Sequence, residues 1–333
     1  MRMTGVRSLA VLLAVCLVAA EAAAAAGDVE ISPKGRRAID AALAYLARTQ
    51  NADGSWNSAN YGKPTAIAAL AGLAFMSDGR LPGRAQYGDN VSKAVDYVLR
   101  SAQPTGLLEY GTPHHAMYSH AFATLFLAEA WGMTSNADIK DKLKNAVDLI
   151  VRTQNREGGW RYEPKVADAD ISVTVCQIVA LRAAANAGIA VPRETVDNAV
   201  GYLKKCERSD GGFAYQAGGG ESAFPRSAGG LVSLVLAGGY DEPEVPRCVN
   251  YLKANANYTG QFWFYGQYYA AQAIHLAAAA EWPAWYSGAT DRLTGRQSVD
   301  GSWTAANEDT GQCTAMGILI LTIPNGYLPL YQR

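Results

Sequence analysis

The sequence has few residues of the kinds that bind metals. Only 4 histidines and 5 cysteines occur in 333 residues, and the cysteines are scattered. They form neither a CxxC pair nor a Cys/His spacing typical of zinc sites. His114, His115 and His120 lie close together in the sequence, but the separation between the last two is poorly suited to two ligands on one helix face. We therefore predict no metal and no cofactor.

The sequence also lacks an excess of one charge. The 29 Lys and Arg residues nearly balance the 30 Asp and Glu residues, which gives a net charge of −1. This balance disfavours nucleic-acid and anionic-membrane partners, because both require a basic face. Hydrophobic residues make up 49% of the chain, so the composition predicts a globular protein with a large core.

Long apolar runs are confined to the N-terminus. Arg2 and Arg7 precede an apolar run over residues 9–20 and an alanine tract over residues 22–26, which is the order of a secretory signal peptide. We expect residues 1–26 to be removed on export to the periplasm or the exterior, leaving one domain over residues 27–333. The alternatives are a membrane anchor, which needs about 20 apolar residues, and a lipoprotein attached through Cys16. No later segment is apolar enough to span a membrane, so we expect no transmembrane segment after cleavage.

The chain is rich in self-similar segments. Three nearly identical segments, each running from a glutamine to a tryptophan, lie at residues 50–56, 154–160 and 297–303. With weaker copies between them, the aromatic anchors are Trp56, Tyr110, Trp160, Phe213, Trp263 and Trp303. Each anchor marks one unit, and the six units cover about residues 36–80, 90–133, 138–190, 194–240, 243–282 and 284–324.

Each unit contains two helices of different character. The helix before the repeated segment has apolar residues at every third or fourth position, which predicts one buried face. The helix after it is apolar nearly all round and is therefore buried on both sides. We expect small residues such as Gly72, Gly230 and Gly317 to let neighbouring inner helices approach closely. The first and last units lack the polar caps of an open solenoid, so we predict an all-α fold, an α6/α6 toroid, in which six helical hairpins form a closed double ring.

The repeated segments resemble the QW motifs of triterpene cyclases, and the unit plan resembles the α6/α6 toroid shared by squalene cyclases and protein prenyltransferases. The resemblance covers roughly residues 36–324. It implies that the glutamine of each strong repeat satisfies the start of a helix and packs on the aromatic ring, as in the pairs Gln50/Trp56, Gln154/Trp160 and Gln297/Trp303. The implied role is stability. The fold alone does not give the activity, because such toroids host several unrelated chemistries.

The starts of the inner helices are far more polar than the rest of these helices. In a closed ring they gather at one end, where free N–H groups and helix dipoles favour anions or polar ligands. We therefore predict a ligand pocket at this end. The candidate catalytic residues are Asp168, Asp170 and Asp309, and the candidate ligand-binding residues are His120, Thr174, Arg226, Tyr265, Tyr268 and Cys313.

Two interpretations of Asp170 remain open. The run Asp168-Ala-Asp170 resembles the Asp-x-Asp-Asp motif with which class II cyclases protonate an alkene or epoxide, and this resemblance implies that Asp170 is the proton donor. Ile171 stands where the last aspartate of that motif would be. The structural interpretation is that Asp170 is a helix N-cap, for which aspartate is a preferred residue. Asp309 has the same cap interpretation.

Three functions are compatible with these residues. The first is a terpenoid-cyclase-like enzyme that acts on an isoprenoid by acid-initiated cyclisation. The second is an exported toroid that binds a small molecule or a partner protein without catalysis. The third is a polysaccharide-active enzyme, which would need paired carboxylates such as Asp170 and Asp309 across a cleft. The zinc prenyltransferase pattern of an Asp-x-Cys pair and a later histidine is not met, because Cys313 lies four residues after Asp309 and no histidine follows His275.

Overall fold

The computed structural model describes residues 29–110, 113–134 and 136–332. The predicted signal peptide, residues 1–26, lies outside the described residues. Within the described ranges the chain forms twelve α-helices and no β-strand. The all-α fold expected from the repeats is therefore confirmed.

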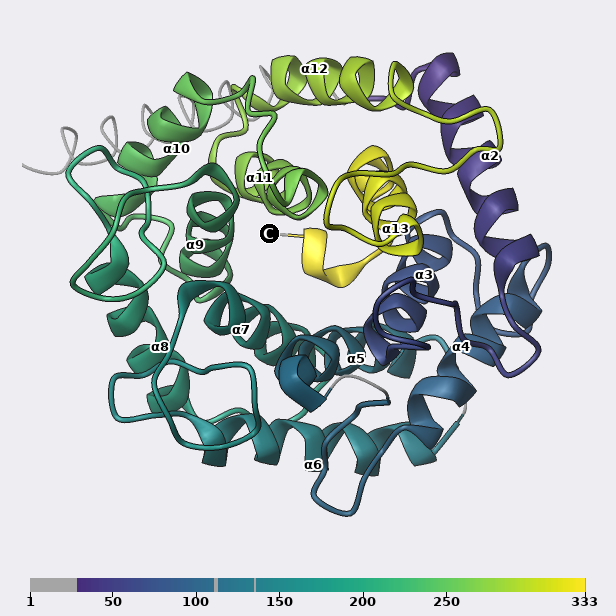
Figure 1. Ribbon diagram of the computed structural model, residues 1–333, viewed down its shortest axis with the longest axis horizontal. Helices are drawn as coiled ribbons and strands as arrows, with labels where there is room; N and C mark the ends of the chain where they lie inside the picture. The colour runs from purple at the N-terminus through teal and green to yellow at the C-terminus, as the bar shows by residue number, and fades with distance from the viewer. Residues whose placement is uncertain (1–28, 111–112, 135, 333) are drawn as a thin grey trace, which may run out of the picture.

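The twelve helices form two concentric rings (Figure 1). The outer ring contains α2 (Pro33–Thr49), α4 (Gly88–Arg100), α6 (Asp138–Thr153), α8 (Arg193–Cys206), α10 (Glu244–Ala254) and α12 (Trp282–Thr294). The inner ring contains α3 (Thr65–Ser77), α5 (Ala116–Trp131), α7 (Ile171–Asn186), α9 (Phe224–Leu236), α11 (Trp263–Ala277) and α13 (Thr310–Leu321). Outer and inner helices alternate along the chain, as the six-unit pattern predicts.

The difference between outer and inner helices follows from their sequences. In α4, the buried residues Val91, Ala94, Val95 and Val98 recur at helical spacing on one face, and the other face is polar. In α3, every residue except Ala66 is buried, because an inner helix contacts outer helices on one side and other inner helices on its flanks. The apolar sequence of the inner helices therefore fixes their place in the ring.

The repeated glutamine and tryptophan join each unit to the next. In the third unit, the Trp160 indole N–H donates to the Ile150 carbonyl at 2.7 Å. The Gln154 amide donates to the carbonyls of Gly158 and Thr195, both at 2.9 Å, and Thr195 belongs to the following outer helix. The first and sixth units repeat these bonds. The predicted structural role of the pair follows from this geometry.

The same bond closes the ring. The Gln297 amide of the last unit donates to the carbonyl of Ala38 in α2 at 2.8 Å. A second link joins the inner ring, where the Thr322 hydroxyl donates to the Ser77 hydroxyl at 2.7 Å. The first and last units are thus neighbours, and the open solenoid is excluded.

One detail of the predicted repeat is wrong. In the second unit, Tyr110 is 41% exposed and Leu108 is fully buried, so the anchor position is two residues earlier than predicted. The small residues of the inner helices make room mainly for aromatic rings. A Cβ atom on Gly72 would lie 2.3 Å from the Phe126 ring, and one on Gly317 would lie 2.7 Å from the Trp303 ring.

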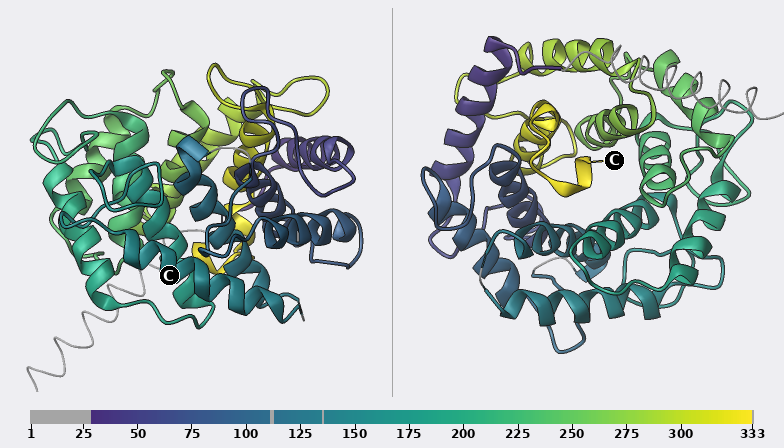
Figure 2. Two further views of the ribbon diagram at one scale, coloured as in Figure 1. Left: turned by 60° about the horizontal axis from the view of Figure 1, so that its bottom comes forward. Right: turned by 180° about the vertical axis from the view of Figure 1, so that it is seen from behind.

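The C-terminal segment lies inside the ring at the end opposite the predicted pocket (Figures 1 and 2). It contains two short 3-10 turns, Ile323–Asn325 and Pro329–Tyr331. Leu328, Leu330 and Tyr331 are buried, and the Leu330 N–H donates to Oε1 of Glu129 in α5 at 3.2 Å. The ring is therefore filled at the end where the inner helices finish and hollow where they begin.

Candidate functional site

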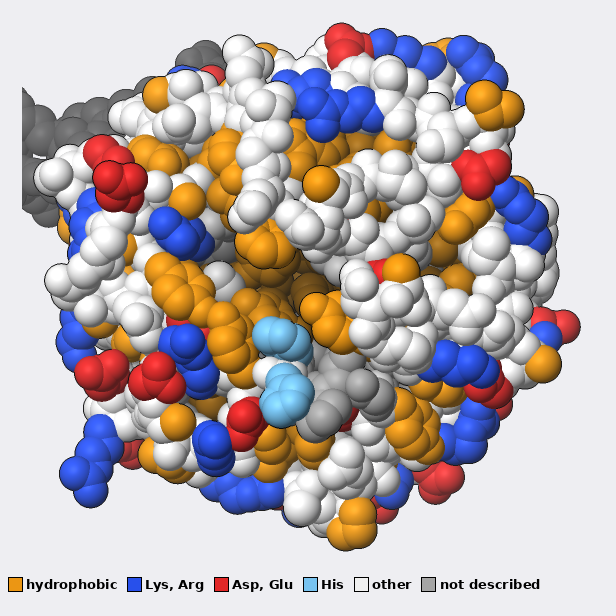
Figure 3. Space-filling model, viewed as in Figure 1, with side chains coloured by type: hydrophobic (Ala, Val, Ile, Leu, Met, Phe, Trp, Pro, Cys, Tyr) orange, Lys and Arg blue, Asp and Glu red, His pale blue; other side chains and the backbone are white. Residues whose placement is uncertain are grey.

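A pocket of about 660 Å³ lies at the N-terminal end of the inner helices. Figure 3 shows the molecule from this end, where hydrophobic side chains line a central hollow. Apolar and aromatic side chains dominate the lining: Tyr61, Pro64, Ala66, Ile67, Leu70, His115, Tyr118, Phe122, Tyr162, Tyr215, Ala223, Pro225, Tyr258, Phe262 and Tyr265. The polar part consists of Ser119, Ser172, Arg226, Gln261, Asn307, Glu308, Asp309 and Gln312. The volume of the whole pocket lies within the range usual for small-molecule sites.

Three predicted site residues line this pocket: Arg226, Tyr265 and Asp309. Arg226 uses its guanidinium on the backbone, with Nε donating to the Phe213 carbonyl at 3.2 Å and Nη2 to the Glu221 carbonyl at 2.8 Å. The Tyr265 hydroxyl donates to the Ser172 carbonyl at 3.2 Å. Both side chains are thus held in fixed positions at the start of the inner ring.

Asp309 holds a loop of the first unit. Its Oδ2 accepts from the Ser58 hydroxyl at 2.9 Å, and its Oδ1 accepts from the Ala59 N–H at 3.1 Å. Its side chain makes no capping bond to α13, so the cap interpretation of Asp309 is wrong. The neighbouring Glu308, which was not among the predicted site residues, accepts from the N–H groups of Phe264 and Tyr265 at 3.2 Å. Burial raises the pKa of Glu308.

Asp170 is fully buried at the start of α7. Its Oδ1 accepts from the Val173 N–H at 3.0 Å, which confirms the N-cap interpretation. Its Oδ2 is buried without a hydrogen-bond partner in the described structure, and Arg161 Nε lies 3.5 Å from it. Burial raises the pKa of Asp170 to about 6, against the lowering effects of the Val173 N–H and the Arg161 charge. The capping role therefore uses only Oδ1, and Oδ2 has Arg161 as its ion-pair partner.

Asp170 lies just behind the aromatic wall of the pocket. Asp170 is not itself a lining residue, but its charge interacts with the hydroxyl of the pocket-lining Tyr118. Burial, and then the charge of Asp170, raises the pKa of the Tyr118 hydroxyl. The rings of Tyr118 and Tyr162 are 6.1 Å apart, and the Tyr162 and Tyr215 hydroxyls hydrogen-bond each other. The pocket-lining side chains of Tyr118 and Tyr215 thus lie close to the Asp170 carboxyl.

Arg161, which was not among the predicted site residues, contacts Asp170 and two pocket-lining rings. Its guanidinium lies 4.8 Å from the Tyr162 ring centre and 5.5 Å from that of Tyr215. It also pairs with Asp168 at 3.1 Å, where the Asp168 side chain is 63% exposed. Asp168 therefore orients Arg161 from the solvent side and does not line the pocket. The available signal was the position of Arg161 directly after the Trp160 anchor.

The structure does not bring His120 and Thr174 to the pocket. Each is buried and accepts the backbone N–H of its own unit's anchor residue: His120 Nδ1 accepts from Leu108 and Thr174 Oγ1 from Trp160, both at 3.1 Å. The other ring nitrogen of His120 lies 3.1 Å from the Ala146 carbonyl. Burial lowers the pKa of His120 to about 4, so it is a neutral hydrogen-bonding residue of the core.

Tyr268 and Cys313 are also buried outside the pocket lining. The Tyr268 ring packs on Tyr269 at 4.8 Å between centres, and burial raises the pKa of the Cys313 thiol. The four described cysteines are all buried and unpaired. Neither Tyr268 nor Cys313 presents a reactive group to the pocket.

Two further features are absent from the described part of the chain, a metal site and a membrane-spanning helix. No group of three or more His, Cys, Asp and Glu side chains there could hold a metal ion. No helix within the described ranges is long and apolar enough to cross a membrane. What the site offers is an aromatic pocket with one buried carboxyl close behind its wall.

Comparison with known sequences identifies related proteins. Residues 41–267 match the family model described as "Prenyltransferase alpha-alpha toroid domain". A drimenyl diphosphate synthase of Streptomyces showdoensis is 29% identical over 224 residues, which is 64% of this chain and 40% of that protein. A second one, from Streptantibioticus cattleyicolor, is 28% identical over 183 residues, or 54% of this chain and 32% of that protein. The chain thus spans less than half the length of these relatives.

Comparison with solved structures supports the fold. The type II terpene cyclase MstE from Scytonema superposes with a TM-score of 0.63 at 16% identity, covering 89% of this chain and all of that one. A variant of that cyclase was solved with its substrate, geranylgeranyl dihydroxybenzoate. An α-1,6-mannanase of Salegentibacter superposes with a TM-score of 0.65 at 7% identity, covering 88% of this chain and 99% of that one. At such low identities these similarities establish the toroid fold, and the chemistry has to be argued from the residues of the site.

Proposed function

Because the chain belongs to the prenyltransferase alpha-alpha toroid family, we propose that its central pocket binds an isoprenoid and that Asp170 initiates cyclisation by protonating a carbon–carbon double bond. The observation that carries this proposal is the buried Asp170 carboxyl, whose Oδ2 has no hydrogen-bond partner in the described structure. The names of the relatives, a drimenyl diphosphate synthase and a terpene cyclase, agree with it.

The environment of Asp170 suits both halves of a proton transfer. Burial disfavours the charged form and raises the pKa of the carboxyl to about 6, so a larger fraction of it carries a proton than for an exposed aspartate. An apolar substrate in the pocket would exclude water and strengthen this effect. After transfer, the carboxylate is stabilised by the Val173 N–H and by Arg161 at 3.5 Å. The raised pKa thus increases the protonated share of the acid before the reaction, and its conjugate base is supported afterwards.

The step itself is balanced. The O–H bond of Asp170 breaks, the π electrons of the alkene form a new C–H bond, and the second alkene carbon becomes a cation. A further double bond of the substrate attacks this cation and forms a C–C bond, and a final proton loss gives the neutral product. The pocket-lining rings of Tyr118, Tyr162, Tyr215 and Tyr265 would stabilise the cations through their π faces, by about 0.5–2 kcal/mol each.

A non-catalytic isoprenoid-binding protein is the second candidate. The observation in its favour is that Asp170 is not among the residues that line the pocket. A polysaccharide-cleaving pair of carboxylates is less well supported, because Asp309 uses both oxygens on Ser58 and Ala59. We also propose export of the chain, on the evidence of the residue pattern over residues 1–26.

The test is turnover of a panel of linear isoprenoids, namely farnesol, geranylgeraniol and their diphosphates, with products analysed by mass spectrometry. We expect a cyclic product from the wild type and at least a hundredfold less from Asp170→Asn. Asp148→Asn, an exposed substitution on outer helix α6, is the matched control and should retain full activity. Saturable binding of these compounds without any product would support the second candidate and reject cyclisation.

A further inference from the structure

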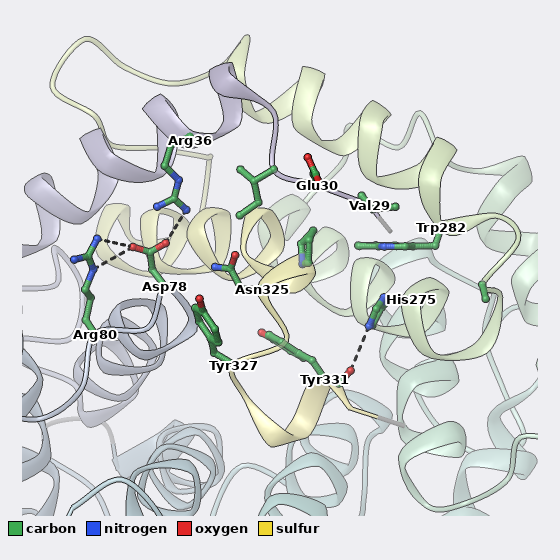
Figure 4. Close-up of a pocket in the computed structure, with 13 residues that line it drawn as sticks. Val29, Glu30, Arg36, Asp78, Arg80, His275, Trp282, Asn325, Tyr327 and Tyr331 are labelled. Atoms are coloured by element: carbon green, nitrogen blue, oxygen red, sulfur yellow. Dashed lines mark hydrogen bonds and ion pairs between the residues drawn. The ribbon is translucent and has the colours of Figure 1, made fainter. Parts of the chain in front are cut away.

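A second pocket, of about 680 Å³, lies at the opposite end of the ring from the central pocket. Segments from distant parts of the chain enclose it: residues 29–31, α2, the end of α3, the end of α11, the start of α12 and the C-terminal segment. In Figure 4, Arg36, Asp78 and Arg80 occupy one side, and His275 and Trp282 occupy the other. The proposed function uses none of these residues.

A pair of arginines forms the charged side of the pocket. Arg36 Nη2 donates to Asp78 Oδ1 at 2.6 Å, and Arg80 donates through Nε and Nη2 to Oδ2 at 3.1 and 3.0 Å. The Asp78 side chain is only 3% exposed, whereas those of Arg36 and Arg80 are 36% and 27% exposed. The buried carboxylate thus fixes two partly exposed guanidiniums beside each other.

The two arginines have donor capacity left. Within the described residues, Arg36 Nε and Arg80 Nη1 make no hydrogen bond, although both side chains line the pocket. Asp78 neutralises one of the two positive charges, so Arg36, Asp78 and Arg80 together carry one net positive charge; Asp40, which pairs with Arg36 at 3.4 Å, is exposed and lies outside the lining. Guanidinium forks of this kind match the geometry of carboxylate and phosphate oxygens.

The other side of the pocket is aromatic and rigid. The Trp282 ring lies 4.9 Å from His275 and 5.2 Å from Tyr286, between ring centres. His275 donates from Nε2 to the Tyr331 carbonyl at 3.2 Å, which ties the C-terminal segment to α11. Because its supports are packed in place, this wall can receive a flat apolar group without reorganising.

We propose that this second pocket is a binding site for a small organic monocarboxylate, whose carboxylate is held by Arg36 and Arg80 and whose apolar body lies against Trp282 and Tyr331. The single net positive charge matches a monoanion. The exposed carboxylate of Glu30, which also lines the pocket, disfavours a dianion such as a phosphate monoester by repulsion.

The test uses isothermal titration of the full chain with 2-naphthoate, its neutral amide and 2-naphthyl phosphate. We expect one saturable site for 2-naphthoate, with the amide and the phosphate each binding about tenfold or more weakly. Arg80→Gln and Arg36→Gln should each weaken naphthoate binding about tenfold or more. Arg36→Lys and Arg80→Lys keep the charge while losing the fork, and should fall between wild type and Gln.

Arg48→Gln is the control, because Arg48 lies on the same helix as Arg36 and lines neither pocket. It should bind naphthoate as the wild type does. If one arginine variant fails to fold, the other still reports, because each leaves Asp78 with one partner. Equal affinity for naphthoate and its amide, unchanged affinity in both Gln variants, or no saturable binding would overturn the proposal. Cyclase turnover plays no part in these readouts, so this site can fail while the proposed function stands.

Discussion

Nε of Arg161 lies 3.5 Å from Oδ2 of Asp170, an oxygen that accepts no hydrogen bond in the described structure. Arg161 thus pairs with two carboxylates: that of Asp168, which is exposed, and that of Asp170, which is fully buried. It leaves Asp170 with too little compensation to offset burial, because the pKa of Asp170 is still raised to about 6. At neutral pH the ionised Asp170 carboxylate therefore destabilises the folded state, and this effect can be measured.

Asp170→Asn should stabilise the fold at pH 7.5. The folded-state pKa of about 6 exceeds the ordinary 3.8, so the native state binds the extra proton between about pH 4 and pH 6. The free energy of unfolding of the wild type therefore falls as pH rises through this range, by up to about 3 kcal/mol. Asparagine keeps a cap for Val173 and has no charge to bury. Urea denaturation at pH 4 and pH 7.5 measures the difference, and Asp168→Asn, an exposed change, is the control. If the free energy of unfolding changed by the same amount between pH 4 and pH 7.5 in the wild type and in Asp170→Asn, the raised pKa of Asp170 would be contradicted.

His120 should show the opposite pH dependence. Burial lowers its pKa from 6.5 to about 4, so the folded state binds fewer protons and the contribution of His120 to stability is lost as pH falls from 6.5 to 4, by about 3 kcal/mol. His120→Ala should cost about 2–4 kcal/mol at pH 7.5, because it leaves the Leu108 N–H and the Ala146 carbonyl without their partner. Isoprenoid affinity should stay unchanged. A weakened affinity in a stably folded variant would instead place His120 in the ligand site.

Trp160 should be a main source of stability. Trp160→Ala removes a buried indole and should lower the free energy of unfolding by about 3–5 kcal/mol. Trp160→Phe keeps most of the ring but leaves the Ile150 carbonyl without its donor, at a cost of about 1–3 kcal/mol. Chemical denaturation measures the free energy of unfolding of both variants. The loss in Trp160→Phe reports the hydrogen bond, and the additional loss in Trp160→Ala reports the packing of the ring. Trp303→Phe, which breaks the same bond to Leu293, should match Trp160→Phe.

Glu129 should make the C-terminal segment sensitive to pH. Burial raises its pKa from 4.5 to about 7, so the native state holds this proton between about pH 4.5 and pH 7 and loses stability as pH rises through that window, by about 3 kcal/mol. Glu129→Gln retains an oxygen to accept the Leu330 N–H and removes the titration. Thermal melts at pH 5 and pH 8 should therefore differ more for the wild type than for this variant. An unchanged difference would assign the pH dependence to other groups.

Much of the fold was predictable because it depends on local patterns. The period of the apolar residues distinguished outer from inner helices, and the three strong repeats at residues 50–56, 154–160 and 297–303 set the unit length. The anchor of the second unit was misassigned because it is Leu108, and a leucine carries no distinguishing signal beside a nearby Tyr110. The roles of Gly72 and Gly317 depend on rings from elsewhere in the chain, which a single segment does not reveal.

The site was predictable in position but less so in membership. The gathering of the inner-helix starts correctly located a pocket with Arg226, Tyr265 and Asp309 in its lining. His120 and Thr174 were selected because they are polar near a helix start, yet their partners are backbone N–H groups of the anchors. Arg161 was missed because its contacts with Tyr162 and Tyr215 form only on folding. Whether a polar side chain hydrogen-bonds the backbone or faces the pocket depends on the folded structure, and the residue type alone does not predict it.

The bond between Gln297 and Ala38 also bears on how the molecule comes apart. A linear array of repeats can fray from either end, because its terminal repeats have one neighbour each. Here each of the six repeats packs on two others, so opening any one of them exposes two interfaces at once. The cost of the first break is therefore high and that of the later ones lower, which makes unfolding an all-or-none event although the sequence is a chain of similar modules.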